Sequence, residues 1–240
     1  MKNISLLIVT LILNNSAFAF LYTDSLYQKS EVQLNVDIVS RHVWRGIINN
    51  SSPSVQPVMK FEFSNFRVGA WASYSVAKET MQEIDIFVGY KLGPILISIY
   101  DYYNPIDTLG WNGDFLQFKS SKTRHTLEAI VEYDGTEKFP VKLMGAVMFY
   151  GYDKDLVGKN YYSTYFEIGY SFDLNSIKVI PHLGFTPFES YYSSKANIVN
   201  LGLTITKDLI LTEKFKLPVR SSFVLNPYQN KAFVVVAITL

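Results

Sequence analysis

The sequence of 240 residues predicts an all-β fold, a transmembrane antiparallel β-barrel of about 12 strands. Three observations indicate this fold class. Apolar and polar residues alternate over stretches of about ten residues, the period of a β-strand with two unlike faces. Aromatic residues make up 15% of the chain, with 17 Tyr and 17 Phe. Short and long connections alternate between the stretches, as they do at the two rims of outer-membrane barrels.

The first 19 residues have the layout of a secretory signal peptide. Residues 1–3 (MKN) carry a positive charge, residues 4–13 are apolar, and residues 17–19 (AFA) form a small-x-small cleavage site. The apolar run is too short to cross a bilayer as a helix. We therefore predict a removable signal peptide over 1–19, a barrel over 20–240 and a location in the bacterial outer membrane. A buried N-terminal helix is the alternative.

Charge and composition narrow the classes of partner and cofactor. The chain has 22 Lys and Arg against 21 Asp and Glu, and cleavage after Ala19 removes Lys2 and leaves equal numbers. A balanced chain gives no electrostatic argument for nucleic acid. Cysteine is absent, which excludes disulfides and thiolate chemistry. The histidines His42, His125 and His182 do not form a metal-binding motif, so we expect no metal and no cofactor.

The first two predicted strands span residues 31–46 and 54–63 and are joined by a polar turn at residues 49–52. In the second strand, Lys60 and Glu62 alternate with aromatic neighbours. One face of this strand is therefore charged and the other is apolar. We expect the charged pair to face water near the periplasmic rim.

The remaining strands follow from the same alternation. In residues 83–92, for example, Ile84, Ile86 and Val88 alternate with Glu83 and Asp85. The further predicted strands span residues 66–77, 82–92, 94–104, 122–134, 139–151, 160–173, 176–188, 196–207, 215–226 and 231–240.

Connections of two kinds link these strands. Tight turns occur at residues 64–65 and 92–94, for example, whereas residues 105–121 and 153–160 are longer. An even number of strands places both termini at the short-turn, periplasmic rim. The longest connection, which contains Trp111, is expected either to extend beyond the membrane or to fold inward and narrow the pore.

Three prolines lie inside predicted strands: Pro57, Pro181 and Pro218. Each lacks the N–H that a strand donates to its neighbour, so we expect either a bulge at each position or strand boundaries that differ by a few residues from those given.

Aromatic residues collect at both strand ends, as in the interfacial girdles of membrane barrels. A soluble β-sandwich or lipocalin-like barrel with an aromatic core is the alternative. The long-loop band comprises Trp44, Tyr102, Tyr103, Phe149, Tyr161, Tyr162 and Tyr191, and the short-turn band comprises Phe63, Phe66, Tyr90, Tyr133, Phe172 and Phe215.

Residues 35–105 resemble the TorF-type family of bacterial outer-membrane porins. The resemblance rests on "SRHVWRG" followed by "SVQPVMKFEF", "FRVGAWASYS" and "EIDIFVGY". It implies an outer-membrane β-barrel with a pore, no catalytic residues and no particular substrate. Barrels of this kind often end in an aromatic residue, whereas this chain ends in Leu240.

The predicted function is a porin-like channel for passive passage of small polar solutes, and not an enzyme. Its expected partners are outer-membrane lipid, the barrel assembly machinery and an unidentified solute. A plugged structural or adhesive barrel, which binds a partner through its outer loops, is one alternative. A rim-type lipid hydrolase is another, with Ser40 and His42 on the outward face beside Trp44.

The alternation also predicts which charges line the lumen and set its ion selectivity. We expect a basic wall to face an acidic wall, with either an open lumen between them or ion pairs that fill the barrel. The candidate selectivity residues are Arg41, Arg45, Glu83, Asp85, Arg124, Glu128, Glu167 and Arg220.

Overall fold

The computed structural model describes residues 30–77, 82–105 and 114–240. The predicted signal peptide and Trp111 lie outside these residues, so the signal peptide stays a prediction. No helix within the described ranges is long and apolar enough to cross a membrane.

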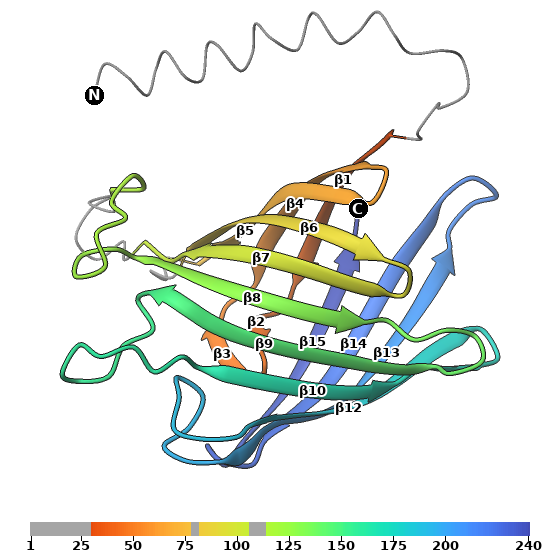
Figure 1. Ribbon diagram of the computed structural model, residues 1–240. Helices are drawn as coiled ribbons and strands as arrows, with labels where there is room; N and C mark the ends of the chain where they lie inside the picture. Colours follow the sequence, from red (N-terminus) through yellow and green to blue (C-terminus); the bar gives the residue numbers. More distant parts are fainter. Residues whose placement is uncertain (1–29, 78–81, 106–113) are drawn as a thin grey trace, which may run out of the picture. The chain divides into compact units, whose positions relative to one another are not determined.

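Thirteen strands form one sheet, and β10 also pairs with β12, which closes the sheet into a barrel (Figure 1). Both β10 and β11 pair with β12, so they share one wall position and the wall has twelve positions. The predicted all-β barrel is confirmed. Its strands are β1 (Ser30–Val39), β4 (Ser54–Phe63), β5 (Phe66–Ser75), β6 (Glu83–Leu92), β7 (Ile95–Tyr103), β8 (His125–Tyr133), β9 (Val141–Gly151), β10 (Thr164–Tyr170), β11 (Phe172–Leu174), β12 (Ile177–Thr186), β13 (Asn197–Ile210), β14 (Lys216–Asn226) and β15 (Lys231–Thr239).

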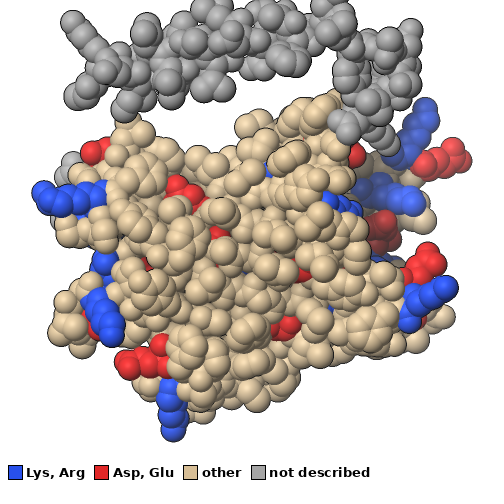
Figure 2. Space-filling view, viewed as in Figure 1, with Lys and Arg blue, Asp and Glu red and all other residues tan. Residues whose placement is uncertain are grey.

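The two faces of the wall follow the alternation in the sequence. In β6, Asp85 and Phe87 are each 6% exposed, whereas Ile86 and Val88 between and beside them are 43% and 49% exposed. The apolar residues therefore point outward and the polar ones inward. Figure 2 shows an outer surface largely without charge over the middle of the strands, with Lys and Arg side chains gathered at the strand ends.

The first predicted strand is wrong beyond Val39. The strand β1 stops there, because the Ser40 hydroxyl accepts a hydrogen bond from the Val236 backbone N–H (3.0 Å) at the edge of β15. The chain then leaves the wall and forms a separate hairpin from β2 (His42–Trp44) and β3 (Ile47–Asn50). The wall closes without this hairpin, since β1 is bonded to β4 directly.

The predicted bulges at prolines are also wrong. The register is unbroken past Pro57, Pro181 and Pro218. Pro181 instead coincides with the interruption between β10 and β11, because β12 pairs with β10 as far as His182 and with β11 from Val179. The missing N–H therefore removes a bond from the neighbouring wall position and leaves the register at Pro181 unchanged, whereas the register shift of β12 falls between Gly184 and Phe185.

The described part of the long connection does neither of the two things expected of it. The Phe118 ring stacks on His125 at 4.1 Å, and the Phe115 carbonyl lies 2.7 Å from His125 Nε2. His125 is paired in register with Tyr103, which shares the outward face of the exposed Ile99. This segment thus packs against the outside of the wall near the long-loop end.

At the short-turn end, members of the predicted aromatic band are exposed: Phe63, Phe66, Phe172 and Phe215 are 46%, 58%, 41% and 46% exposed, and Phe66 and Tyr90 stack edge to face at 4.6 Å. The membrane-interface role of the band stays a prediction. At the long-loop end three members are misplaced. Trp44 lies in the inward hairpin, Tyr102 is 8% exposed on the inner face, and Tyr191 lines the smaller interior cavity beside Trp44. Periodicity alone did not separate these residues from outward ones, because both surroundings are apolar there.

Candidate functional site

The hairpin β2–β3 turns at Arg45 and Gly46. Their φ angles are +48° and +79°, and Trp44 pairs with Ile47, so the hairpin has a two-residue loop with both φ positive. A Cβ at Gly46 would lie 2.0 Å from the Val199 backbone oxygen. Glycine is therefore required both by the backbone conformation and by the close approach of β13.

Arg45 at the tip crosses the barrel interior to Glu128 of β8. Its guanidinium donates two hydrogen bonds to the carboxylate, at 2.6 and 2.9 Å, and a third to the Tyr192 hydroxyl. The planar group also lies over the Trp44 and Tyr165 rings, 4.5 and 4.7 Å from their centroids. This is the bidentate geometry that makes Arg the usual partner of a buried carboxylate.

The Glu128 side chain is fully buried, and both of its carboxylate oxygens accept hydrogen bonds. The Tyr102 hydroxyl donates a further hydrogen bond to the same carboxylate, at 2.7 Å. A buried charge is tolerated where its partners satisfy its oxygens, as they do here.

An aromatic layer surrounds the hairpin near the long-loop end. The Trp44 ring lies 5.7 Å from both Tyr102 and Tyr192 and 6.4 Å from Tyr191. The hairpin backbone is held as well, because the Asn226 side chain donates to the Gly46 carbonyl at 3.1 Å. The layer therefore combines rings from the hairpin, from β7 and from the loop that follows β12.

Cavities lie on both sides of this layer. The larger has a volume of about 720 Å³ and reaches Lys60 and Arg220 toward the short-turn end. The smaller, of about 290 Å³, is lined by long-loop residues that include Asp153. Trp44 and Tyr102 line both cavities, so they form part of the boundary between them.

Asp153 belongs to the loop that follows β9. Its carboxylate accepts hydrogen bonds from the Ser163 N–H and hydroxyl, at 2.8 and 2.6 Å. Burial raises the pKa of the Asp153 carboxyl above its ordinary value, although these hydrogen bonds act in the opposite direction.

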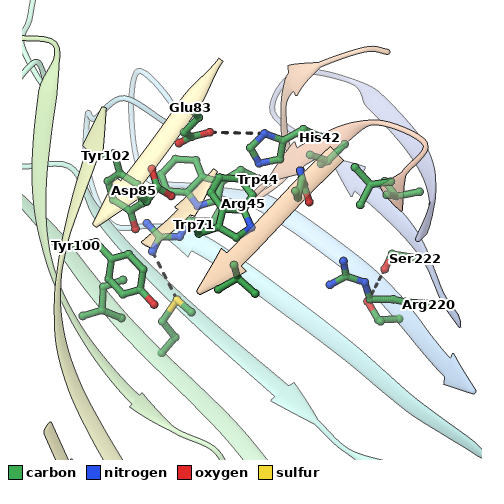
Figure 3. Close-up of a pocket in the computed structure, with 18 of the residues that line it drawn as sticks. His42, Trp44, Arg45, Trp71, Glu83, Asp85, Tyr100, Tyr102, Arg220 and Ser222 are labelled. Atoms are coloured by element: carbon green, nitrogen blue, oxygen red, sulfur yellow. Dashed lines mark hydrogen bonds and ion pairs between the residues drawn. The ribbon is translucent and has the colours of Figure 1, made fainter. Parts of the chain in front are cut away.

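The larger cavity is strongly charged. Figure 3 shows His42, Trp44 and Arg45 of the hairpin among Trp71, Glu83, Asp85 and Tyr102 of the wall, with Arg220 and Ser222 on the other side. The basic side chains around it are Arg41, Arg45, Lys60, Arg67 and Arg220, and the acidic ones are Glu83, Asp85, Glu132 and Glu167.

The acidic side chains of this cavity and two of its basic ones lie on different parts of the wall. Several of these side chains also form ion pairs with near neighbours. The acidic groups belong to β6, β8 and β10, whereas Lys60 and Arg220 belong to β4 and β14, on the other side of β5 in the strand order. Lys60 pairs with Glu62 at 2.8 Å, and Arg220 pairs with Asp37 at 3.1 Å. Lys60 and Glu62, the two alternating charges of the second predicted strand, thus both face the lumen.

Six of the eight predicted lumen residues line the larger cavity: Arg41, Arg45, Glu83, Asp85, Glu167 and Arg220. Two do not. Glu128 is inside the barrel but buried against Arg45. Arg124 lies before β8, with its guanidinium 4.8 Å from the centroid of the Tyr152 ring, and lines the smaller cavity. Arg124 keeps the parity of the inward Thr126 but lies beyond the end of β8, so it lines the smaller cavity at the long-loop end.

The sequence analysis missed other residues of the cavity. Arg67 and Glu132 lie 3.9 Å apart across it. Trp71, which shares the inward face of β5 with Arg67, lines the same cavity. The alternation could have predicted Arg67, Trp71 and Glu132, because each lies an even number of residues from another inward residue of its strand.

The proposed pair of Ser40 and His42 does not share the outward face. The His42 ring contacts Trp71 at 5.3 Å and its Nδ1 lies 3.6 Å from Glu83, inside the barrel. Ser40 is bonded to β15, as described above. Among the described residues, no group of three or more His, Cys, Asp or Glu is placed to hold a metal ion.

Comparisons with known proteins give a family and a distant structural likeness. A family model described as "Bacterial protein of unknown function (Gcw_chp)" matches residues 26–215. No curated protein matches the chain. The crystal structure of an outer membrane channel from Pseudomonas putida F1 is 11% identical, with a TM-score of 0.37, and the alignment covers 91% of this chain and 98% of that one. The TorF-type name stays a prediction. The chain belongs to the Gcw_chp family of bacterial proteins.

Proposed function

We propose that the protein is an outer-membrane channel for small polar solutes, whose hairpin β2–β3 narrows the lumen at the long-loop end. The apolar outer face supports a location in lipid, which implies insertion by the barrel assembly machinery. The charged interior supports the passage of polar solutes. The proposal includes no catalytic step.

One observation carries the proposal: a charged cavity of about 720 Å³ ends at a layer of side chains that is completed by a hairpin outside the wall. The hairpin is attached by side-chain contacts of Arg45 and by the bond from Asn226 to Gly46. Such contacts can break while the strand ladder of the wall remains intact. The hairpin is therefore placed to act as a gate.

Conductance in planar bilayers tests this function. We compare the wild-type barrel with a variant in which a short Gly-Ser linker replaces residues 41–50. The linker variant should conduct continuously, and the wild type should conduct less or only in brief openings. The proposal fails if the assembled linker variant carries no current, because the hairpin then is not what limits passage.

A plugged structural barrel is the second candidate. The complete burial of Glu128 and Tyr165 beside the hairpin favours it, since a packed interior of this kind stabilises a closed lumen. This candidate predicts no current from the wild type under any applied voltage and a clear loss of stability in the linker variant.

A further inference from the structure

Asp85 occupies an unusual position on the cavity wall. It lies within β6, and its register partners are Trp71 on β5 and Tyr102 on β7. All three residues line the larger cavity (Figure 3). Asp85 is nevertheless only 6% exposed, so its carboxylate is largely removed from solvent.

In the part of the chain that the structure describes, no Lys, Arg or His forms an ion pair with the Asp85 carboxylate. Its buried Oδ1 has no hydrogen-bond partner among the described residues. The other inward carboxylates differ: Glu83 lies 3.6 Å from His42 Nδ1 and accepts from Asn49, Glu128 is bound by Arg45, Glu132 lies near Arg67, and Glu167 accepts from Asn200 at 2.9 Å. A buried carboxylate without a partner is costly unless something else binds it.

Aromatic residues neighbour Asp85 on the inner face of the wall. Trp71 and Tyr102 flank it in the sheet, and Phe87 follows it on the same face of β6. Tyr100 stacks on Phe87 at 5.1 Å and on Tyr102 at 5.7 Å, which makes a continuous row of rings along the wall. Ring faces attract cations, and most strongly where water is excluded.

One end of this row already accepts a cation of the protein. The Arg67 guanidinium lies 5.6 Å from the centroid of the Phe87 ring and donates to the Tyr100 hydroxyl at 3.2 Å. Arg67 pairs in register with Gly89, four residues along β6 from Asp85. The end of the row beside Trp71 and Asp85 thus has the chemistry of a cation site and no Lys or Arg of the described chain paired with it.

We infer that Asp85, with Trp71 and Tyr102 beside it, binds the ammonium group of a small organic solute in the lumen. The carboxylate supplies the counter-charge, and the rings favour an alkylated ammonium over a strongly hydrated metal cation. A cavity of about 720 Å³ has room for such a solute. The inference deepens the proposed function, on which it rests, by naming the class of solute.

Equilibrium dialysis of detergent-solubilised protein with radiolabelled choline tests the site. Choline should bind, and 3,3-dimethyl-1-butanol, its uncharged isostere, should compete poorly. Asp85→Asn should weaken choline binding by about tenfold or more, because it removes the counter-charge and keeps the shape. Glu132→Gln is the matched control, since it removes a carboxylate from the same cavity, and it should change binding much less.

Several results would overturn the inference. Equal competition by the isostere would indicate an apolar pocket, and unchanged binding by Asp85→Asn would indicate a carboxylate without a role. Equal weakening by Glu132→Gln would indicate a general effect of lumen charge. Trp71→Leu is the second variant and should weaken choline binding without a change of charge. Its unchanged affinity would also contradict the site. Heat-modifiable migration on gels verifies that each variant is folded.

Choline binding and current through the lumen can be tested separately. The dialysis requires only a folded barrel, whereas the proposed function requires current through the lumen. Choline binding to a barrel that never conducts would reject the channel and retain the site. Conductance without choline binding would do the reverse.

Discussion

Arg45 and Glu128, which are 83 residues apart in the sequence, are joined by two hydrogen bonds across the interior of the barrel. The Arg45 side chain is 7% exposed and that of Glu128 is not exposed. We predict that Arg45→Ala destabilises the barrel by about 3–5 kcal/mol, since it leaves a buried carboxylate without its partner. Urea unfolding in detergent or lipid, followed by tryptophan fluorescence, measures the change.

Two controls separate this effect from a general loss of charge. Lys142→Ala breaks the exposed pair with Asp134 and should cost less than about 1 kcal/mol. Adding Glu128→Gln to Arg45→Ala should recover part of the lost stability. Equal costs for the Arg45 and Lys142 variants would show that the interior pair is not isolated from water.

Gly46→Ala should displace the hairpin tip. Its Cβ would meet the Val199 oxygen at 2.0 Å, and the positive φ adds strain for any other residue. If the hairpin narrows the lumen, the variant should conduct more than the wild type in planar bilayers. Gly93→Ala is the control, because Gly93 also has a positive φ but nothing within 4 Å of the added Cβ. An increase in both variants would reflect backbone strain alone.

A charged side chain placed on the outward face should destabilise the barrel. Ile86 and Ile168 are 43% and 49% exposed on the wall, and replacement of either by Arg should cost about 2–4 kcal/mol in a bilayer. Thr204→Arg, on the inward face beside the cavity, should cost much less. Folding titrations in lipid vesicles compare the three variants. Similar costs would mean that Ile86 and Ile168 do not contact hydrocarbon.

Asp153 should make the long-loop end sensitive to pH. Because its folded-state pKa is raised by burial, its contribution to stability is complete below the unfolded-state value of about 3.9 and is lost as the pH rises through the folded value. The Tm of Asp153→Asn should therefore rise relative to wild type from pH 3 toward neutral pH. Thermal unfolding measures this difference. Asp173→Asn, at an exposed pair, is the control.

The sequence predicts the wall well because a strand has only two faces. Residues such as Asp85 and Ile86 differ in polarity at every step, so their alternation determines which points inward. The hairpin was not predictable in the same way. Trp44 is apolar whether it faces lipid or a packed interior, and Arg45 at a turn position with positive φ is not a typical turn signal. Nothing local to Arg45 indicates its distant partner, Glu128.

The pairing of β1 with β15 has a consequence for how the barrel is made. Asp37 pairs with Thr239 and Val39 with Ala237, so the two ends of the barrel sequence form its seam. Until β15 pairs with β1, both strands present unpaired edges, which are prone to pair with other chains. The wall therefore cannot close before β15 has been synthesised, so the two strands of the wall most distant in the sequence have to meet before either edge is protected.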